Sequence, residues 1–251
     1  MSATDRCFLS DNAAGVSPEI LDAVARCNAG AAAGYGADPL TAALTDRFRR
    51  FFGHDRLEVF LVATGTAANA LSLAACCPPW GAVLCHEFAH VARDECGAPE
   101  FYTAGAKLCP VPGEHARLTP EALERAFAGF RLNDPHQTQP GALSLSQATE
   151  AGTVYRPDEV AALAAWAHAR GMRLHMDGAR LANAVVGLGC APAEATWRAG
   201  VDILSFGATK NGALAAEAVV AFEPALARDM AYRRKRAGQL LSKSRFFAAQ
   251  F

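Results

Sequence analysis

Two charged residues, Asp177 and Lys210, stand where apolar segments of the sequence end. Asp177 closes the segment 172–177, and Lys210 follows the segment 202–206. If both segments are strands of one open α/β sheet, the two side chains lie beyond its carboxyl edge, where such sheets bind ligands. A partly desolvated lysine can form an imine with a carbonyl cofactor, and an aspartate can keep a pyridine nitrogen protonated. The pair alone does not separate this chemistry from a solvent-facing lysine and a helix-capping aspartate.

A third feature is the turn Thr64-Gly65-Thr66, which follows the apolar segment 57–63 and opens a helical run over 67–76. A glycine-containing turn at a helix N-terminus exposes N–H groups at the positive end of the helix dipole, which favours a phosphate. Without the other two features, the turn is an ordinary strand–helix connection with Thr66 as the helix cap.

These residues need a sheet to position them, and the sequence predicts one. Short apolar segments alternate with longer helical ones, which is typical of a mainly parallel sheet covered by helices. Hydroxyl-Pro-Glu and Pro-Asp-Glu sequences mark helix starts, and we expect helices near 20–33 and over 160–170, the latter ended by Gly171. The seven predicted strands are Leu57–Ala63, Ala82–Cys85, Lys107–Val111, Ala142–Gln147, Met172–Asp177, Asp202–Phe206 and Ala218–Phe222.

Composition excludes several classes of function. The 251 residues are 51% hydrophobic, enough for one large core, and 24 basic against 25 acidic residues give a net charge of -1, which attracts neither nucleic acid nor an anionic membrane. We expect a small-molecule partner. Eight scattered cysteines without a C-x-x-C motif predict reduced thiols. The polar N-terminus and the absence of a long apolar run predict a cytoplasmic protein.

Together, several segments of the chain resemble the low-specificity L-threonine aldolases, which are aspartate-aminotransferase-like enzymes that use pyridoxal 5′-phosphate. The resemblance extends from about Ser10 to Phe251, and the two segments around Asp177 and Lys210 are its most specific part. The matching segments are Ser10-Asp11-Asn12, Tyr35-Gly36, Gly65-Thr66-Ala67-Ala68-Asn69, Ala89-His90, Asp94-Glu95-Cys96-Gly97-Ala98-Pro99-Glu100, His175-Met176-Asp177-Gly178-Ala179-Arg180-Leu181 and Ser205-Phe206-Gly207-Ala208-Thr209-Lys210-Asn211-Gly212.

The resemblance implies a cofactor site. Lys210 would carry pyridoxal 5′-phosphate as a Schiff base, and Asp177 would bind the pyridine nitrogen. Gly65 and Thr66 would hold the phosphate, with Arg245 reaching the cofactor of a neighbouring subunit. The resemblance therefore also implies a homo-oligomer, either a dimer or a tetramer.

The resemblance also implies residues for the substrate, a β-hydroxy-α-amino acid such as threonine or allo-threonine. His90 would stack on the cofactor ring and assist proton transfer, either as the base or by orienting a water. Ser10 and Arg180 would hold the substrate carboxylate, and Tyr35 would border the site. The products would be glycine and an aldehyde, acetaldehyde in the case of threonine.

The expected organisation has three parts. Residues 1–50 form an N-terminal arm and helices, 51–225 form the cofactor-binding large domain, and 226–251 form a long basic helix that leads to a missing or truncated C-terminal small domain. Because that small domain would supply a second carboxylate-binding arginine, we expect the chain as it stands to bind cofactor weakly or to catalyse poorly. Its apolar end is expected to pack on its own domain, unless the rest of the protein is absent.

Three other functions fit the sequence. The segment His86-Glu87-Phe88-Ala89-His90 matches the H-E-x-x-H motif of zinc hydrolases, although it follows a predicted strand and Arg93 and Cys96 depart from the extended motif. Another fold-type-I lyase, such as a β-eliminase, would share the lysine and aspartate. A truncated scaffold without catalysis is the third alternative. With no metal expected in the aldolase, zinc binding would favour the hydrolase.

Overall fold

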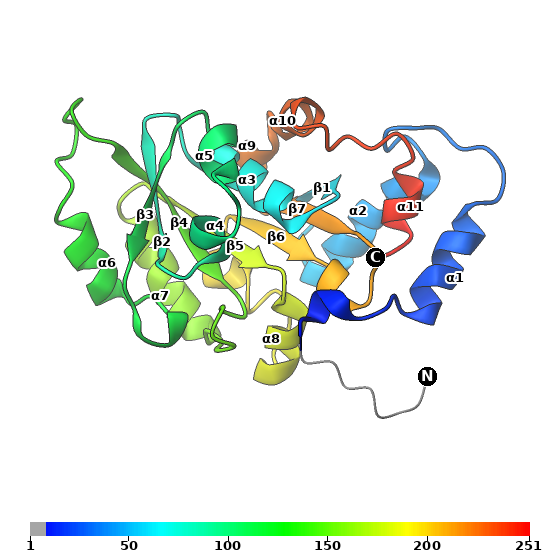
Figure 1. The fold of residues 1–251 in the computed structure, drawn as a ribbon, viewed down its shortest axis with the longest axis horizontal. Coiled ribbons are helices and arrows are strands. Elements are labelled where there is room, and N and C mark those ends of the chain that lie inside the picture. Colours follow the sequence, from blue (N-terminus) through cyan, green and yellow to red (C-terminus); the bar gives the residue numbers. More distant parts are fainter. Residues whose placement is uncertain (1–8) are drawn as a thin grey trace.

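The computed structural model describes residues 9–251, and within them seven strands form one sheet between two layers of helices (Figure 1). Each predicted strand is confirmed, with its ends shifted by at most three residues. The strands are β1 (Glu58–Val62), β2 (Gly81–His86), β3 (Lys107–Val111), β4 (Gln139–Ser146), β5 (Arg173–Gly178), β6 (Ile203–Gly207) and β7 (Glu217–Ala221). The predicted α/β class, a mainly parallel seven-stranded sheet, is therefore confirmed.

The strand order places several chain segments at one edge of the sheet. The order is β1-β7-β6-β5-β4-β2-β3, and β7 runs antiparallel to both of its neighbours while the other pairs are parallel. The carboxyl ends of β1, β2, β4, β5 and β6 consequently share an edge with the start of β7. The connections that leave this edge are the ones that carry the residues singled out in the sequence.

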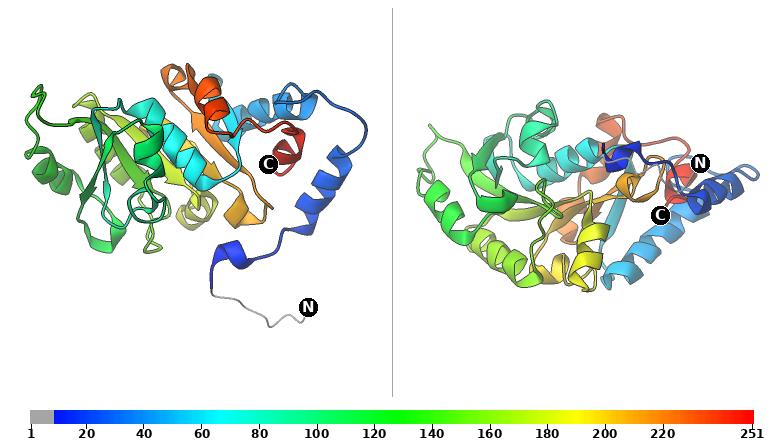
Figure 2. Two further views of the ribbon diagram at one scale, coloured as in Figure 1. Left: turned by 45° about the horizontal axis from the view of Figure 1, so that its top comes forward. Right: turned by 60° about the horizontal axis from the view of Figure 1, so that its bottom comes forward.

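The helices lie on both faces of the sheet. On one face α3 packs against β5, β6 and β7 and is joined by α5, α9 and α10, while α2, α6 and α7 cover the other face, as the right-hand view of Figure 2 shows. The helix bounds are α1 (Pro18–Cys27), α2 (Pro39–Phe52), α3 (Gly65–Cys76), α4 (His90–Arg93), α5 (Ala98–Tyr102), α6 (Pro120–Phe127), α7 (Pro157–His168), α8 (Leu181–Leu188), α9 (Pro224–Ala227), α10 (Met230–Arg236) and α11 (Arg245–Ala248).

Alternation along the strands fills two cores. Leu143 and Leu145 of β4 point into the core beneath α7, whereas Ala142 points into the core beneath α3. Because both faces are covered, the central strands are apolar on both sides and appear in the sequence as nearly continuous apolar runs. This property made the strands predictable.

The prediction of a long basic helix over 226–247 is wrong. The segment forms three short helices, α9, α10 and α11, and Gly238 has a left-handed φ of 71° just beyond α10. A glycine in this conformation ends a helix, so the apolar end of the chain turns back onto its own domain. There the rings of Phe251 and Phe48 of α2 lie 5.4 Å apart, which confirms the expected packing. The first helix is also shorter than expected, since α1 ends at Cys27.

Other expectations concern the cysteines, membrane-spanning helices and the N-terminal arm. The seven cysteines within residues 9–251 are all free thiols, as predicted. In this same part of the chain, no helix has both the length and the apolar character needed to cross a lipid bilayer. The first eight residues of the predicted N-terminal arm lie outside the described residues.

Candidate active site

A cavity of about 270 Å³ opens at the carboxyl edge of the sheet. It collects residues from the ends of β4 and β5, from the start of β7 and from the segments that follow β1, β2 and β6. These residues are distant in sequence and meet only because the strands end at one edge. Its lining consists of Asn12, Ala63, Thr64, Gly65, Thr66, Asn69, His90, Ser146, Ala148, Glu150, Asp177, Ala179, Arg180, Thr209, Lys210 and Glu217. Six of the nine predicted site residues are therefore brought together: Gly65, Thr66, His90, Asp177, Arg180 and Lys210.

The carboxylate of Asp177 is held at the base of the cavity. Asp177 lies near the end of β5 and is 9% exposed. Its Oδ2 accepts a hydrogen bond of 2.8 Å from Nδ2 of Asn69, and its Oδ1 accepts one of 3.0 Å from the N–H of Ala179. Two donors fix the orientation of this side chain without neutralising its charge, so it can face a cationic or N–H group of a ligand.

Lys210 lies in a short 3₁₀ helix, Thr209–Asn211, directly after β6. Its positive charge acts on Asp11, His90 and Glu217, which places the amine among the ionisable groups of the cavity. Glu217, the first residue of β7, is buried, and this burial raises its pKa to about 7, although hydrogen bonds from Thr209 oppose the shift. The cavity thus contains an amine beside a carboxyl group that changes charge near neutral pH.

The N-terminus of α3 forms one wall of the cavity. Thr64 is the N-cap, and its hydroxyl accepts a hydrogen bond of 3.1 Å from the N–H of Ala67. The alternative in which Thr66 caps this helix is wrong, because the helix begins two residues earlier, at Gly65. The N–H groups of Gly65 and Thr66 belong to the first turn, which has no acceptors within its own helix. No atom lies within 4 Å of the position that a Cβ would take on Gly65, so an anion can approach closely.

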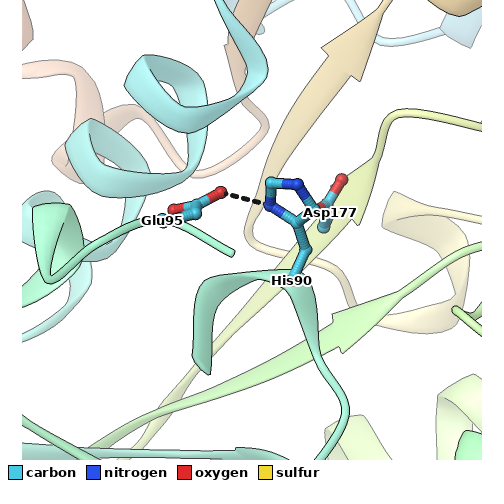
Figure 3. Close-up of side chains that lie close together, drawn as sticks. All are labelled: His90, Glu95 and Asp177. Carbon is cyan, nitrogen blue, oxygen red and sulfur yellow. Dashed lines mark hydrogen bonds and ion pairs between the residues drawn. The ribbon is translucent and has the colours of Figure 1, made fainter. Parts of the chain in front are cut away.

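The imidazole of His90 faces the cavity from the start of α4 (Figure 3). The backbone N–H of His90 donates to Oε1 of Glu150 at 2.9 Å, and the ring Nδ1 lies 2.9 Å from Oε1 of the buried Glu95. This hydrogen bond raises the pKa of His90, and the charges of Glu95 and Asp177 add to the effect while burial and Lys210 oppose it. A histidine in this position can accept or donate a proton near neutral pH.

Arg180 presents its guanidinium to the cavity and is already engaged by a carboxylate. Its Nε lies 2.6 Å from Oδ2 of Asp11, and its Nη2 lies 3.0 Å from Oδ1 of the same residue. Burial disfavours the ionised form of Asp11, but the hydrogen bond and charge of Arg180 outweigh burial and lower the pKa. The fork geometry suits any carboxylate, including that of an amino acid.

Three predicted site residues do not line the cavity. Ser10 caps the short 3₁₀ helix 11–13 by accepting from the N–H of Asn12 at 3.2 Å. Tyr35 is 56% exposed, with its ring beside Lys235, and Nη1 of Arg245 donates to the carbonyl of Gly30 at 3.1 Å. The roles expected for these three residues stay predictions.

The zinc-hydrolase motif does not form. His86 is the last residue of β2 and His90 begins α4, so the two rings are not one turn apart on a helix. His86 is 3% exposed; its Nε2 donates to the carbonyl of Gly113 at 2.9 Å, and its Nδ1 accepts from the N–H of Phe88 at 3.1 Å. Both nitrogens are used, so this histidine has no lone pair for a metal.

Sequence reasoning missed three residues of the site, Asn69, Glu95 and Glu217. Asn69 and Glu95 lie in the segments that carry the family resemblance, but nothing in their spacing shows that they touch each other or Asp177. Glu217 could have been found from the sequence, because it is a charged residue at the start of the apolar strand Glu217–Ala221. A buried carboxylate is uncommon unless it is paired or functional.

Comparison with known proteins places this chain in a family. The sequence profile of the family described as beta-eliminating lyase matches residues 8–250. A low-specificity L-threonine aldolase of Pseudomonas aeruginosa is 50% identical over 242 residues, which cover 96% of this chain and 69% of that protein. A solved structure of a threonine aldolase from Leishmania major superposes with a TM-score of 0.90 at 29% identity, covering 97% of this chain and 70% of that one. An aspartate aminotransferase of Thermus thermophilus shares the fold, with a TM-score of 0.72 at 20% identity and coverage of 95% and 65%.

Proposed function

The chain belongs to the beta-eliminating lyase family, and on this premise we propose that it is a pyridoxal 5′-phosphate-dependent aldolase. The proposed reaction cleaves β-hydroxy-α-amino acids such as threonine and allo-threonine into glycine and an aldehyde, acetaldehyde for these two substrates. The relatives that support this choice are low-specificity L-threonine aldolases. The chain spans about 69% of their length.

The observation that carries the proposal is that one cavity contains Lys210, Asp177 and the N-terminus of α3. These three features correspond to the three parts of the cofactor, namely its aldehyde carbon, its pyridine nitrogen and its phosphate. The carboxylate of Asp177 has neighbours that donate to it but no cation paired with it among the described ion pairs. The residues present therefore fit the cofactor.

In this proposal Lys210 would hold the cofactor at its aldehyde carbon, Asp177 would hold the pyridine nitrogen, and the N–H groups of Gly65 and Thr66 would hold the phosphate. His90 would face the cofactor from the start of α4. When bound, the cofactor supplies an electron sink for the negative charge left on Cα. Arg245, on the outside of the same domain, is proposed to reach the cofactor of a neighbouring subunit.

The chain's own residues would orient the substrate and move its protons. Arg180 would hold the substrate carboxylate, which would replace Asp11 on the guanidinium. Ser10 is proposed to hold the carboxylate together with Arg180, and Tyr35 is proposed to border the site. By fixing the carboxylate, Arg180 would determine which bond at Cα is oriented for cleavage. Nε2 of His90 takes the proton of the β-hydroxyl group, directly or through a water that it orients.

The test is covalent trapping followed by product analysis. The protein is incubated with pyridoxal 5′-phosphate, absorption spectra are recorded before and after borohydride reduction, and the modified peptide is mapped. We expect the label on Lys210 in the wild type and in a Lys107→Ala control, whose substituted residue is exposed on β3, but not in Lys210→Ala.

Product analysis then distinguishes the reaction class. Threonine should give glycine and acetaldehyde in equal amounts, whereas a β-eliminase would release ammonia and a 2-oxo acid. Labelling of Lys210 without aldehyde would retain the cofactor and reject the aldolase. Absence of any label together with bound zinc would favour a hydrolase, and absence of both would favour a non-catalytic scaffold.

We further propose a cytoplasmic homo-oligomer, a dimer or a tetramer, with residues 51–225 as its cofactor-binding unit. Free cysteines throughout residues 9–251 are compatible with a reducing compartment. Light scattering on the purified chain would measure the assembly, and a monomer that retains full activity would contradict it.

A further inference from the structure

Asn69 lies between two buried carboxylates in the wall of the cavity. It is 2% exposed on α3, and its Nδ2 lies 2.8 Å from Oε1 of Glu95 and 2.8 Å from Oδ2 of Asp177. The amide nitrogen has two hydrogens, so it can donate one to each carboxylate. The reversed amide would turn its oxygen toward both carboxylates, and this repulsion fixes the orientation.

The contacts of Asn69 with the two carboxylates leave buried polar atoms without partners, which a purely structural residue would avoid. Oδ1 of Asn69 and Oε2 of Glu95 are buried without a hydrogen-bond partner in residues 9–251. Two buried carboxylates in the same cluster also repel each other, and such a pair ordinarily keeps one proton between them. Burial raises the pKa of Glu95 and the charge of Asp177 adds to this, while hydrogen bonds from His90 and Asn69 act in the opposite direction.

The same oxygen of Glu95 reaches His90. Oε1 of Glu95 lies 2.9 Å from Nδ1 of the ring, and as an acceptor it requires the hydrogen of a neutral imidazole to be on Nδ1. The charged groups that face His90 are Glu95, Asp177 and Lys210, and Glu150 accepts from its backbone N–H. Figure 3 shows His90 between the two carboxylates, with its second ring nitrogen turned away from Glu95.

We propose that Asn69 is a positioning residue whose amide locks Glu95 and Asp177 as acceptors, and that Glu95 in turn keeps the proton of His90 on Nδ1 and leaves Nε2 free to react. This inference deepens the proposed function, on which the reactive role of Nε2 rests. Asn69 would thereby connect Asp177, which is proposed to bind the pyridine nitrogen, to the reactive His90. The connection runs through Glu95. A proton arriving at Nε2 gives an imidazolium that Glu95 stabilises.

The amide also explains why the three ionisable side chains lie close together. Ligand atoms of His90, Glu95 and Asp177 are all within 4.8 Å of one another, close enough for one metal ion. However, the two amide hydrogens of Asn69 point at these two carboxylates. The third contact of the cluster is the hydrogen bond between Nδ1 of His90 and Oε1 of Glu95. A cation at this place would have to compete with these donors.

The test reads the histidine directly, in the chain without cofactor or substrate. Nitrogen NMR of ¹⁵N-histidine-labelled protein distinguishes the two neutral tautomers, and His90→Gln identifies the signal of His90. We expect the wild type to have its hydrogen on Nδ1. In Asn69→Ala and in the nearly isosteric, uncharged Asn69→Leu, Glu95 should retain a proton to higher pH, so the His90 tautomers mix and its titration midpoint moves to lower pH.

A matched control is Ser72→Ala, a buried change on the same helix, whose hydroxyl has no hydrogen-bond partner within residues 9–251. It should leave His90 unchanged, and Glu95→Gln should reproduce the downward shift. If folded Asn69→Leu and Asn69→Ala proteins keep the wild-type tautomer and midpoint, the inference is wrong even if the chain is an aldolase. Conversely, an altered His90 would support the inference even if labelling of Lys210 failed.

Discussion

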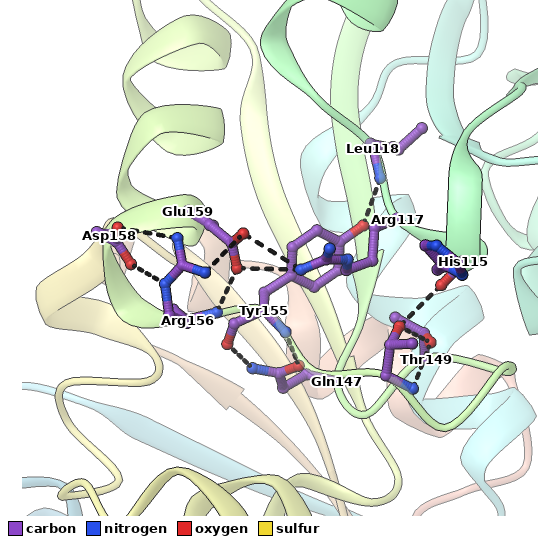
Figure 4. Close-up of polar contacts among 10 residues, drawn as sticks. His115, Arg117, Leu118, Gln147, Thr149, Tyr155, Arg156, Asp158 and Glu159 are labelled. Atoms are coloured by element: carbon purple, nitrogen blue, oxygen red, sulfur yellow. Dashed lines mark hydrogen bonds and ion pairs between the residues drawn. The ribbon is translucent and has the colours of Figure 1, made fainter.

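Two polar clusters of this molecule differ in how their carboxylates are paired. In the cavity, Asn69, Glu95 and Asp177 are buried, and two of their oxygens have no partner in the described part of the chain. At the start of α7, the carboxylates of Asp158 and Glu159 each meet a guanidinium (Figure 4). We call the second group, with Arg117 and Arg156, the α7 ion-pair network.

The α7 ion-pair network pairs each of its carboxylates with a guanidinium, although Nε of Arg117 is buried without a hydrogen-bond partner in the described residues. Glu159 lies 3.2 Å from Nη1 of Arg117 and 3.3 Å from Nη1 of Arg156, and its Oε2 accepts from the N–H of Arg156 at 2.8 Å. These contacts cap α7 and connect it to the chain before α6. The arrangement is what local stability requires, whereas the cavity keeps like charges together and leaves acceptors open.

This difference indicates which cluster was shaped for function. A chain stabilised everywhere would not place Glu95 and Asp177 on the same amide, and local conflicts of this kind are concentrated at active sites. The comparison can be tested by changing matched residues in the two regions.

The largest effect is expected from Arg180→Gln. It removes two charge-assisted hydrogen bonds to a carboxylate, worth roughly 1.5–3 kcal/mol each, and so kcat/KM for threonine should fall by about a hundredfold or more. It also leaves Asp11 partly buried without its cation, which disfavours an anionic substrate. Arg156→Gln in the α7 ion-pair network should leave kcat/KM at the wild-type value. Equal losses in the two variants would show that the regions do not differ in function.

A second large effect is expected from Gly207→Ala. A Cβ at this position would lie 2.8 Å from Oε2 of Glu217 and 2.9 Å from Cα of Ala179, closer than real contacts allow. We expect a loss of about 1–3 kcal/mol in the free energy of unfolding, measured by urea denaturation. Gly187→Ala, on the exposed side of α8 with no atom within 4 Å, should instead stabilise by about 0.5–1 kcal/mol. Tolerance of Gly207→Ala would mean that the floor of the cavity is not tightly packed.

The sequence predicted the strands and the cavity because both depend on local patterns. Buried strands are continuous apolar runs, and residues such as Asp177 and Lys210 are located by the strands that precede them. Both cavity bridges of Asn69 join residues that are distant in sequence, 26 positions away for Glu95 and 108 for Asp177, so only the folded sheet reveals them. The prediction of a long C-terminal helix was wrong for a related reason. The many basic residues favour a helix, but Gly238 and the packing of Phe251 against Phe48 override this local preference.

A smaller effect is expected from Glu217→Gln, and it depends on pH. Burial raises the pKa of Glu217 from its ordinary 4.5 to about 7, so its protonation stabilises the fold fully below pH 4.5 and this contribution is lost as the pH rises through 7. Glutamine stays neutral, and the variant should therefore gain stability over the wild type as the pH rises from 5 to 8. Because the side chain lines an open cavity, we expect a gain on the order of 1 kcal/mol, less than the full shift implies.

Thermal unfolding at pH 5 and pH 8 measures this difference. Glu19→Gln, on the exposed first turn of α1, should show no such dependence. A Glu217→Gln variant with the same gain at both pH values would contradict the proposed cost of ionising a carboxyl group in the cavity.

The smallest effect is expected from Glu159→Gln in the α7 ion-pair network. Glutamine keeps an oxygen for the N–H of Arg156 and removes only the charge that faces Arg117 and Arg156. The guanidinium of Arg156 is 60% exposed, so its pairing is screened by water, and the loss should be about 0.2–1 kcal/mol in low salt. In 1 M salt, where the screening length falls to roughly 3 Å, the difference from the wild type should nearly vanish. Urea denaturation at two salt concentrations measures it. A loss that persists in high salt would mean that Glu159 acts through burial, as the carboxylates of the cavity do, and the contrast between the two clusters would then be one of degree.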